Sequence, residues 1–198
     1  MSTQQVPLTY EGILEMFRET REQMKESDRK FREMSQETDR KFQETSKKIS
    51  ALGSRIGEII ENMVAGNIVK KFQRLGYAVT ECFPRKPFRN KKLGIRGEVD
   101  LFLDDGDDNS EIAILIEVKT TLEVADVREH IERLEKYRRY ANAGGNGNKT
   151  LLIGAVAGAI VKENTAKFAQ ENGMYVIVQS GDAVEIVPLP EGFTAKEW

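Results

Sequence analysis

The chain has 198 residues, of which 39% are hydrophobic and 31% charged, and its formal net charge is -2. This composition supports one globular core with an appendage, and it excludes collagen-like, disulfide-stapled and wholly disordered proteins. No apolar run reaches the roughly 18 residues of a membrane helix, and the N-terminus lacks a signal-peptide pattern. A single cysteine cannot form an internal disulfide. We therefore expect a cytoplasmic protein without a membrane partner. The single histidine excludes metal sites built from several imidazoles, so carboxylates would hold any metal ion.

A long, highly charged helix is predicted from Tyr10 to about residue 56. Between Tyr10 and Ala51 the sequence contains no proline and only one glycine. Its sparse large apolar residues, continued to residue 63, fall within about 100° of one another on a helical wheel. They are Phe17, Met24, Phe31, Met34, Phe42, Ile49, Leu52, Ile56, Ile60 and Met63.

This narrow apolar stripe indicates self-association. The motif Asp28-Arg-Lys-Phe31 recurs as Asp39-Arg-Lys-Phe42, and a repeat of about 11 residues is typical of a straight or slightly right-handed coil. A single helix cannot bury its own stripe, so we predict a coiled coil that forms a homo-oligomer. Two alternatives stay open: a lone charged helix, and a disordered tail that folds on a partner.

The apolar face changes further along the same helix. A second stripe is rotated by about 120° from the first, and it contains Val64, Ala65, Ile68, Phe72 and Leu75. The rotation predicts that a coiled-coil segment, residues 1–56, joins a globular domain, residues 57–198. Gly76 is predicted to end the helix as a C-terminal cap.

The remainder alternates between short strands and helices, which predicts an α/β domain with a mixed sheet flanked by helices. Strands are predicted at Tyr77–Phe83, Glu98–Leu103, Glu111–Lys119, Thr150–Val156, Met174–Gln179 and Ala183–Val187. Helices are predicted at Leu122–Tyr140 and Lys162–Asn172, and a loop at Pro84–Arg96. The turn-rich segment Asp104–Ser110 should join the second and third strands as a hairpin.

That hairpin carries the residues of chemical interest. Ile112–Ile116 is continuously apolar, as in a central strand covered on both faces. Glu117 and Lys119 follow on one face. One hairpin register places Asp100 opposite Glu117, and a neighbouring register also fits. Two carboxylates on adjacent strands suit Mg²⁺, and a lysine beside them suits metal-assisted phosphodiester hydrolysis. The alternative is that Glu117 and Lys119 form an ordinary exposed ion pair.

These residues resemble the signature of the PD-(D/E)XK nuclease superfamily. Gly97-Glu-Val-Asp100 followed by Ile114-Leu-Ile-Glu-Val-Lys-Thr120 is particularly similar to the form found in Holliday-junction-resolvase-like endonucleases. The whole chain resembles a largely uncharacterised bacterial family with an N-terminal coiled coil. That family combines an Asp-Arg-Lys-Phe repeat, a nuclease-like domain and a Pro-x-Gly-Phe segment, here Pro190–Phe193.

The resemblance implies a restriction-endonuclease-like fold with an αβββαβ core. It also implies that Asp100 and Glu117 bind Mg²⁺ or Mn²⁺ and that Lys119 is catalytic. The proline that precedes the aspartate in the signature is replaced here by Val99, which active relatives tolerate. The family adds a glutamate from the first helix. Of the two candidates, Glu58 and Glu61, the helical wheel favours Glu61 as the third ligand.

The predicted loop before Asp100 is strongly basic. Residues 57–96 hold nine basic and three acidic side chains, so the near-neutral total conceals a local positive region. The cations of the loop are Arg85, Lys86, Arg89, Lys91, Lys92 and Arg96, and Phe83 and Phe88 lie among them. Such cations bind phosphates, and an exposed phenylalanine stacks on bases. The alternative is a solvated, mobile loop. His130 is expected at the surface, outside any catalytic site.

These observations predict a Mg²⁺-dependent DNA endonuclease, acting on duplex or branched DNA, that is oligomerised by its coiled coil. Because the superfamily includes members that have lost activity, the alternative is an inactive nuclease-fold binding or assembly module. A purely structural coiled-coil protein is the third interpretation.

Overall fold

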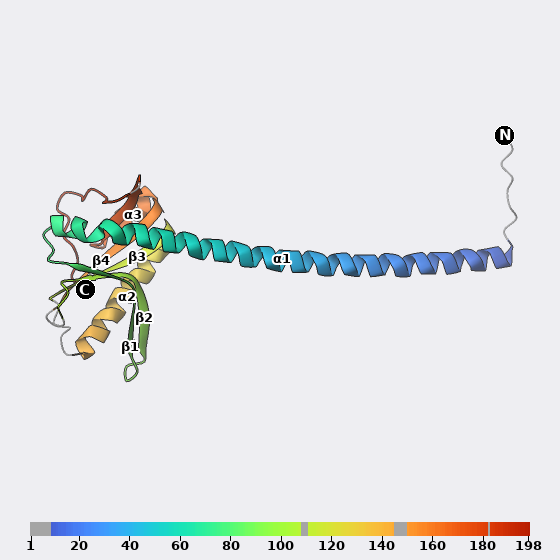
Figure 1. Cartoon of the computed structure of the whole chain (residues 1–198), viewed down its shortest axis with the longest axis horizontal. Coiled ribbons are helices and arrows are strands. Elements are labelled where there is room, and N and C mark those ends of the chain that lie inside the picture. The colour runs from blue at the N-terminus through green and yellow to red at the C-terminus, as the bar shows by residue number, and fades with distance from the viewer. Residues whose placement is uncertain (1–8, 108–110, 145–149, 182) are drawn as a thin grey trace. The chain divides into compact units, whose positions relative to one another are not determined.

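The computed structural model describes residues 9–107, 111–144, 150–181 and 183–198 (Figure 1). It divides into two compact units, Met1–Leu52 and Gly53–Trp198. Helix α1 (Tyr10–Arg74) begins in the first unit and ends in the second. None of the helices described is both long enough and apolar enough to cross a membrane.

The first unit is a stretch of α1 whose charges pair along the helix. Glu26 and Lys30 lie 2.8 Å apart, and Glu37 and Lys41 lie 2.7 Å apart, which is the i,i+4 spacing that stabilises isolated helices. The large side chains of the first apolar stripe are exposed here, as a helix without a neighbour requires.

The second unit contains a six-stranded mixed sheet whose spatial order follows the sequence. The strands are β1 (Glu81–Asn90), β2 (Ile95–Asp104), β3 (Ile112–Leu122), β4 (Leu151–Val161), β5 (Tyr175–Ser180) and β6 (Ala183–Ile186). Helix α2 (Val124–Ala143) connects β3 to β4, and α3 (Glu163–Glu171) connects β4 to β5. The β3–β4 and β4–β5 pairs are parallel, and the other pairs are antiparallel. The predicted α/β class and the αβββαβ order are confirmed.

Two apolar clusters cover the sheet, one on each face. The C-terminal part of α1 packs on one face, and α2 and α3 pack on the other. Strand β3 divides its side chains between them, since Ile114 and Ile116 face α1 whereas Ala113 and Leu115 face α2. This two-sided burial explains why β3 is continuously apolar.

Helix α1 ends in the predicted way. Gly76 has a φ of 92°, its amide donates to the Gln73 carbonyl, and the Tyr77 amide donates to the Phe72 carbonyl. The rings of Phe72 and Tyr77 are in contact, which completes a Schellman motif with its apolar contact.

The second stripe is confirmed at Val64, Ile68 and Phe72, which are buried. Three assignments were wrong. Ile60 and Met63, placed in the first stripe, pack in the globular core, where Ile60 is buried and Met63 partly buried, while Leu75 is exposed. Leu75 lies beyond the last helical residue, so the helical wheel no longer describes its direction.

The predicted loop Pro84–Arg96 was wrong, because these residues form β1, a turn at 91–94 and the start of β2. The predicted strand Tyr77–Phe83 likewise begins only at Glu81. Pro84 and Pro87 argued against a strand, but β1 is at the edge of the sheet, where a missing N–H group breaks no ladder bond.

The predicted β2–β3 hairpin is antiparallel, with Leu101 opposite Ile116 and Asp104 opposite Ala113. Extended by one residue, this register sets Asp100 opposite Glu117. The sequence register that pairs Asp100 with Glu117 predicts a hairpin centre between Asp108 and Asn109, and these two residues lie outside the described ones.

Two glycines, one inside α1 and one just after its end, provide a matched test of the helix terminus. A Cβ at either Gly76 or Gly66 would meet no atom within 4 Å, so the two sites differ mainly in backbone conformation. We expect Gly76→Ala to destabilise the globular unit by about 1 kcal/mol, because φ is positive there. Gly66→Ala, inside the helix, should stabilise it by about 1 kcal/mol. Urea unfolding followed by fluorescence of the single tryptophan, Trp198, measures both. Equal effects of the two substitutions would contradict the assigned cap.

Candidate functional site

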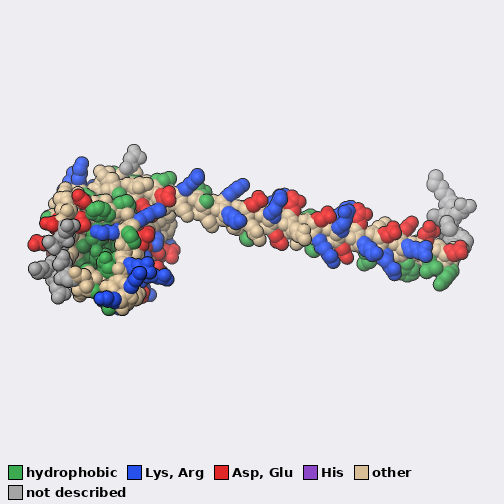
Figure 2. All heavy atoms as spheres, turned by 60° about the horizontal axis from the view of Figure 1, so that its bottom comes forward, with side chains coloured by type: hydrophobic (Ala, Val, Ile, Leu, Met, Phe, Trp, Pro, Cys, Tyr) green, Lys and Arg blue, Asp and Glu red, His purple; other side chains and the backbone are tan. Residues whose placement is uncertain are grey.

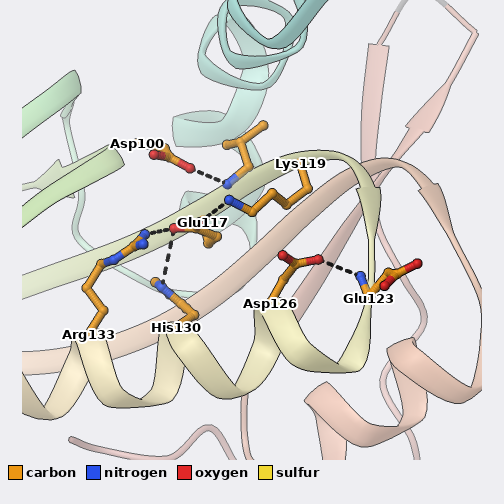
Figure 3. Close-up of polar contacts among 8 residues, drawn as sticks. Asp100, Glu117, Lys119, Glu123, Asp126, His130 and Arg133 are labelled. Carbon is orange, nitrogen blue, oxygen red and sulfur yellow. Dashed lines mark hydrogen bonds and ion pairs between the residues drawn. The ribbon is translucent and has the colours of Figure 1, made fainter. Parts of the chain in front are cut away.

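The candidate site lies where β3 passes into α2 (Figure 3). Glu117 follows the apolar run of β3 and points to the α2 face, together with Lys119. Helix α2 begins a few residues later with a capping box, in which the Glu123 amide donates to Asp126 at 2.8 Å. Such a box fixes the start of a helix, so it sets which side chains of α2 face Glu117.

Glu117 is a buried carboxylate held among basic groups. Its side chain is 3% exposed. One oxygen, Oε1, lies 2.7 Å from Lys119 Nζ, and the other, Oε2, contacts the guanidinium of Arg133. Two cations therefore offset the desolvation of this carboxylate. The ordinary exposed ion pair, kept as the alternative for Glu117 and Lys119, does not describe this arrangement.

His130 was wrongly expected at the surface, since it is fully buried. Its Nε2 lies 3.1 Å from the carbonyl oxygen of Leu115, so Nε2–H donates and Nδ1 is left as an acceptor. Nδ1 has no hydrogen-bond partner and faces Glu117 Oε2 at 3.9 Å. Desolvation lowers the pKa of His130 to about 4, which keeps the ring neutral at pH 7. Nearby, Asp100 acts to raise this pKa and Lys119 to lower it.

His130 and Arg133 could have been found from the sequence. Both lie on the side of α2 that carries the apolar residues Val127 and Leu134, at three- and four-residue spacing. A helical wheel of α2 places the two polar side chains beside this inward stripe. The residues next to them in the sequence are charged, and these neighbours alone indicate a position on the solvated face.

Asp100 occupies an irregular point of β2. Its Oδ2 accepts a hydrogen bond of 2.8 Å from the amide of Val118, the residue after Glu117. Val99 packs in the α2-side cluster and Leu101 in the α1-side cluster, although residues two apart in a regular strand share a face. The strand thus changes face at Asp100, and on β1 Arg85 has a φ of 51° at the corresponding position.

The structure brings Asp100, Glu117 and Lys119 to one point of the sheet, but it gives Glu61 a different partner. Glu61 Oε2 receives a 3.0 Å hydrogen bond from Arg85 Nε, and Glu58 lies 3.6 Å from the same guanidinium. Arg85 is next to Asp100 across the β1–β2 ladder. Glu61 therefore faces the site through Arg85, and its role as a third metal ligand stays a prediction.

The donor set fits a metal ion in part. Within the described ranges, no three His, Cys, Asp or Glu side chains gather in a way that could hold an ion. Two carboxylates on neighbouring strands nevertheless match Mg²⁺, which is commonly bound by one or two carboxylates and keeps several waters. Asp100 and Glu117 are thus the residues that suit the ion.

The six predicted phosphate-binding cations fall into two groups. At the base of the β1–β2 hairpin, Arg85 pairs with Glu61, and Lys86 lies 3.6 Å from Asp104. Burial lowers the pKa of Lys86, against the effect of Asp104. Towards the tip, the other four side chains are exposed, namely Arg89, Lys91, Lys92 and Arg96. The structure therefore places the cations that face solvent at the tip.

The suggested stacking role does not fit Phe88. Phe88 is 3% exposed and packs on Tyr137 and Tyr140 of α2, at ring-centroid distances of 5.2 and 5.5 Å. Phe83 is partly exposed, and the Lys86 ammonium lies 4.9 Å from its ring centre. Phe88 therefore anchors the hairpin and is not available to a base.

Neither a protein-family model nor a curated protein matches this chain. Two solved structures resemble it weakly. One is a repair endonuclease from Pyrococcus abyssi, with a TM-score of 0.34 and 18% identity over 59% of this chain and 45% of that one. The other is the small subunit of a heterodimeric restriction endonuclease, with a TM-score of 0.29 and 17% identity over 58% of this chain and 60% of that one. The chain thus spans less than two thirds of the length of either protein.

The burial of His130 predicts a pH-dependent stability. Its pKa is about 4 in the folded protein, against 6.5 for a histidine side chain in water, so the unfolded chain binds more protons between these values. Stability should therefore rise with pH from about 4 to 6.5, by about 3 kcal/mol in total from this group. NMR titration of the single imidazole measures its pKa directly. The charged groups that surround the ring are Glu117, Lys119, Arg133 and Asp100. A midpoint at or above 6.5 would contradict the buried neutral ring.

Proposed function

We propose that the globular unit, assigned to residues 57–198, is a Mg²⁺- or Mn²⁺-dependent endonuclease domain that hydrolyses phosphodiester bonds of DNA. One observation carries the proposal. Asp100 and Glu117, on neighbouring strands, lie at the same point of the sheet, because the Asp100 carboxylate accepts a hydrogen bond from the amide of Val118. Lys119 lies beside Glu117. The sequence signature described above supports the same assignment.

Each residue has a distinct role in this proposal. Asp100 and Glu117 would hold the ion, which when bound supplies an acidified water and stabilises charge on the phosphate. Lys119 Nζ lies 2.7 Å from Glu117, where it can orient a water molecule. The Arg133 guanidinium contacts Glu117 and offsets the cost of burying that carboxylate, and the buried ring of His130 excludes water from its far side.

One observation favours the second candidate, an inactive nuclease-fold binding module. Both oxygens of Glu117 already contact a cation, and Glu61 is engaged by Arg85. A carboxylate whose charge is satisfied in this way does not require a metal ion. In this case, the domain would retain the fold and the basic surface without turnover.

Cleavage of supercoiled, linear and branched DNA in the presence of Mg²⁺ or Mn²⁺ distinguishes the candidates. We expect the wild-type protein to nick DNA and Asp100→Ala to abolish nicking, because the ion loses a ligand. Lys119→Met should reduce the rate by about 100-fold, a typical contribution of a proton-transferring group.

Glu98→Gln is the matched control, since it removes one carboxylate from the exposed face of the same strand. It should cleave as the wild type does. If wild type and Asp100→Ala are equally inactive on all substrates, the catalytic proposal is wrong. Calorimetry then tests the binding module, which predicts no Mn²⁺ binding that depends on Asp100 or Glu117.

We also propose that residues 1–56 associate with further copies of this chain as a coiled coil. Thr38 and Thr45 fill gaps in the exposed apolar stripe on the helical wheel. Each donates its hydroxyl group to the carbonyl four residues earlier, at 2.8 Å. Their hydroxyls are therefore satisfied within the helix, and burial against a second helix would leave neither of these donors unpaired.

Sedimentation analysis tests this association. The wild-type protein should be oligomeric, and Phe31→Asp should shift it towards monomer, because a charge buried in the seam costs several kcal/mol. Gln36→Asp adds the same charge on the opposite side of the helix and should leave the oligomer intact. A monomeric wild-type protein would contradict the coiled coil.

A further inference from the structure

The tip of the β1–β2 hairpin carries four exposed cations: Arg89, Lys91, Lys92 and Arg96. We call them the tip cations. The ion pairs of the described residues include none of the four, whereas Arg85 and Lys86 at the hairpin base are paired with acids. Figure 2 shows Lys and Arg side chains gathered at the end of the globular unit formed by this hairpin.

Two of the tip cations face each other directly. Arg89 and Arg96 are partners in the β1–β2 register, and like charges directly opposite in an antiparallel pair destabilise it. An anion bound between or beside the two guanidinium groups would relieve this repulsion. The arrangement therefore favours a polyanionic ligand over free solvent at this surface.

The opposite face of the hairpin is fixed to the core. Phe88, Ile95 and Val99 are buried in the cluster that includes α2, so Arg89 and Arg96, on the alternate positions, face away from α2. Gly97 leaves space for the Phe88 ring, since a Cβ there would lie 2.3 Å from Phe88 Cζ. This packing holds the cations on an ordered ribbon rather than on a mobile loop.

The turn at the tip is also well defined. The Asn90 side-chain oxygen accepts hydrogen bonds from the amides of Lys92 at 3.0 Å and Leu93 at 3.2 Å, and Gly94 has a φ of 64°. Leu93 is 54% exposed at the end of this turn. Because the turn is ordered before binding, a ligand has little conformational entropy to remove.

We propose that the hairpin tip is a two-stranded arm that enters the major groove of duplex DNA. The tip cations would contact backbone phosphates, and Leu93 would meet base edges such as thymine methyl groups. The major groove of B-form DNA is about 12 Å wide and admits a β-ribbon. The major groove of A-form RNA is too narrow for side chains, so the geometry favours DNA. This proposal rests on the endonuclease function only for the identity of the polymer.

Fluorescence anisotropy of the full chain with a labelled DNA duplex tests the arm. The measurement is made in EDTA, so that no metal-dependent cleavage occurs. Four phosphate contacts predict a slope of about -3.6 for log affinity against log salt. The double substitution Arg89→Gln with Arg96→Gln removes two contacts, so the slope should become about half as steep, about -1.8. Binding at low salt should weaken by roughly tenfold or more.

Lys70→Gln with Lys167→Gln is the matched control, because it removes two exposed cations from α1 and α3. It should bind as the wild type does. The double arginine variant should unfold at the same urea concentration as the wild type or a higher one, since it removes the repulsion. Lost binding in a folded variant therefore supports the arm.

The arm proposal is overturned if the double arginine variant binds duplex DNA like the wild type. It is also overturned if the wild type binds single-stranded DNA, duplex RNA or vesicles of anionic lipid as tightly as duplex DNA. Asp100→Asn separates this question from catalysis. The wild-type protein refutes the endonuclease proposal alone if it binds through the arm but never cleaves with Mg²⁺ or Mn²⁺, and it refutes the arm proposal alone if it cleaves without needing Arg89 and Arg96.

Discussion

The buried carboxylate of Glu117 is the constraint on which this end of the sheet depends. The apolar run of β3 carries it between β3 and α2, where it is almost completely shielded from water. Lys119 of the same strand and Arg133 of α2 neutralise it. Packing of α2 and neutralisation of Glu117 are thus a single requirement, since a buried charge that loses its partner costs roughly 3–5 kcal/mol. Asp100 is held at the same place because its carboxylate accepts a hydrogen bond from the amide of Val118, where the β2–β3 ladder ends.

Much of this arrangement could be predicted from the sequence, because it depends on periodicity. The period of two places Glu117 and Lys119 on one face, and the continuous apolar run identifies β3 as a strand covered on both sides. Two neighbouring registers fitted the hairpin, and the structure has the one that continues to Asp100 and Glu117. The change of stripe along α1 was predictable for the same reason, although the wheel failed at Leu75, where the helix has ended.

The rest depends on contacts between segments that are distant in the sequence. Pro84 and Pro87 indicate a loop unless β1 is known to be an edge strand. Phe88 is buried only because α2 supplies Tyr137 and Tyr140. Glu61 was assigned as a metal ligand by its direction on the helix, but its hydrogen-bond partner is Arg85, which comes from β1. His130 and Arg133 depend on which side of α2 packs against β3, and charged neighbours obscured that side.

The distribution of charge along the hairpin connects the two proposals. Asp100 would repel a phosphodiester, and the cations beside Glu117 are already paired with that carboxylate. A chain with a net charge of -2 therefore needs its attraction elsewhere. At the hairpin base, the cations are already bound to Glu61 and Asp104, and they add little attraction at long range. At the tip, Arg89 and Arg96 face each other across the β1–β2 ladder. Attraction for a polyanion is therefore concentrated at the hairpin tip, where Arg96 precedes Asp100 by four residues of β2, and it can hold DNA there without neutralising the groups that would bind the metal ion.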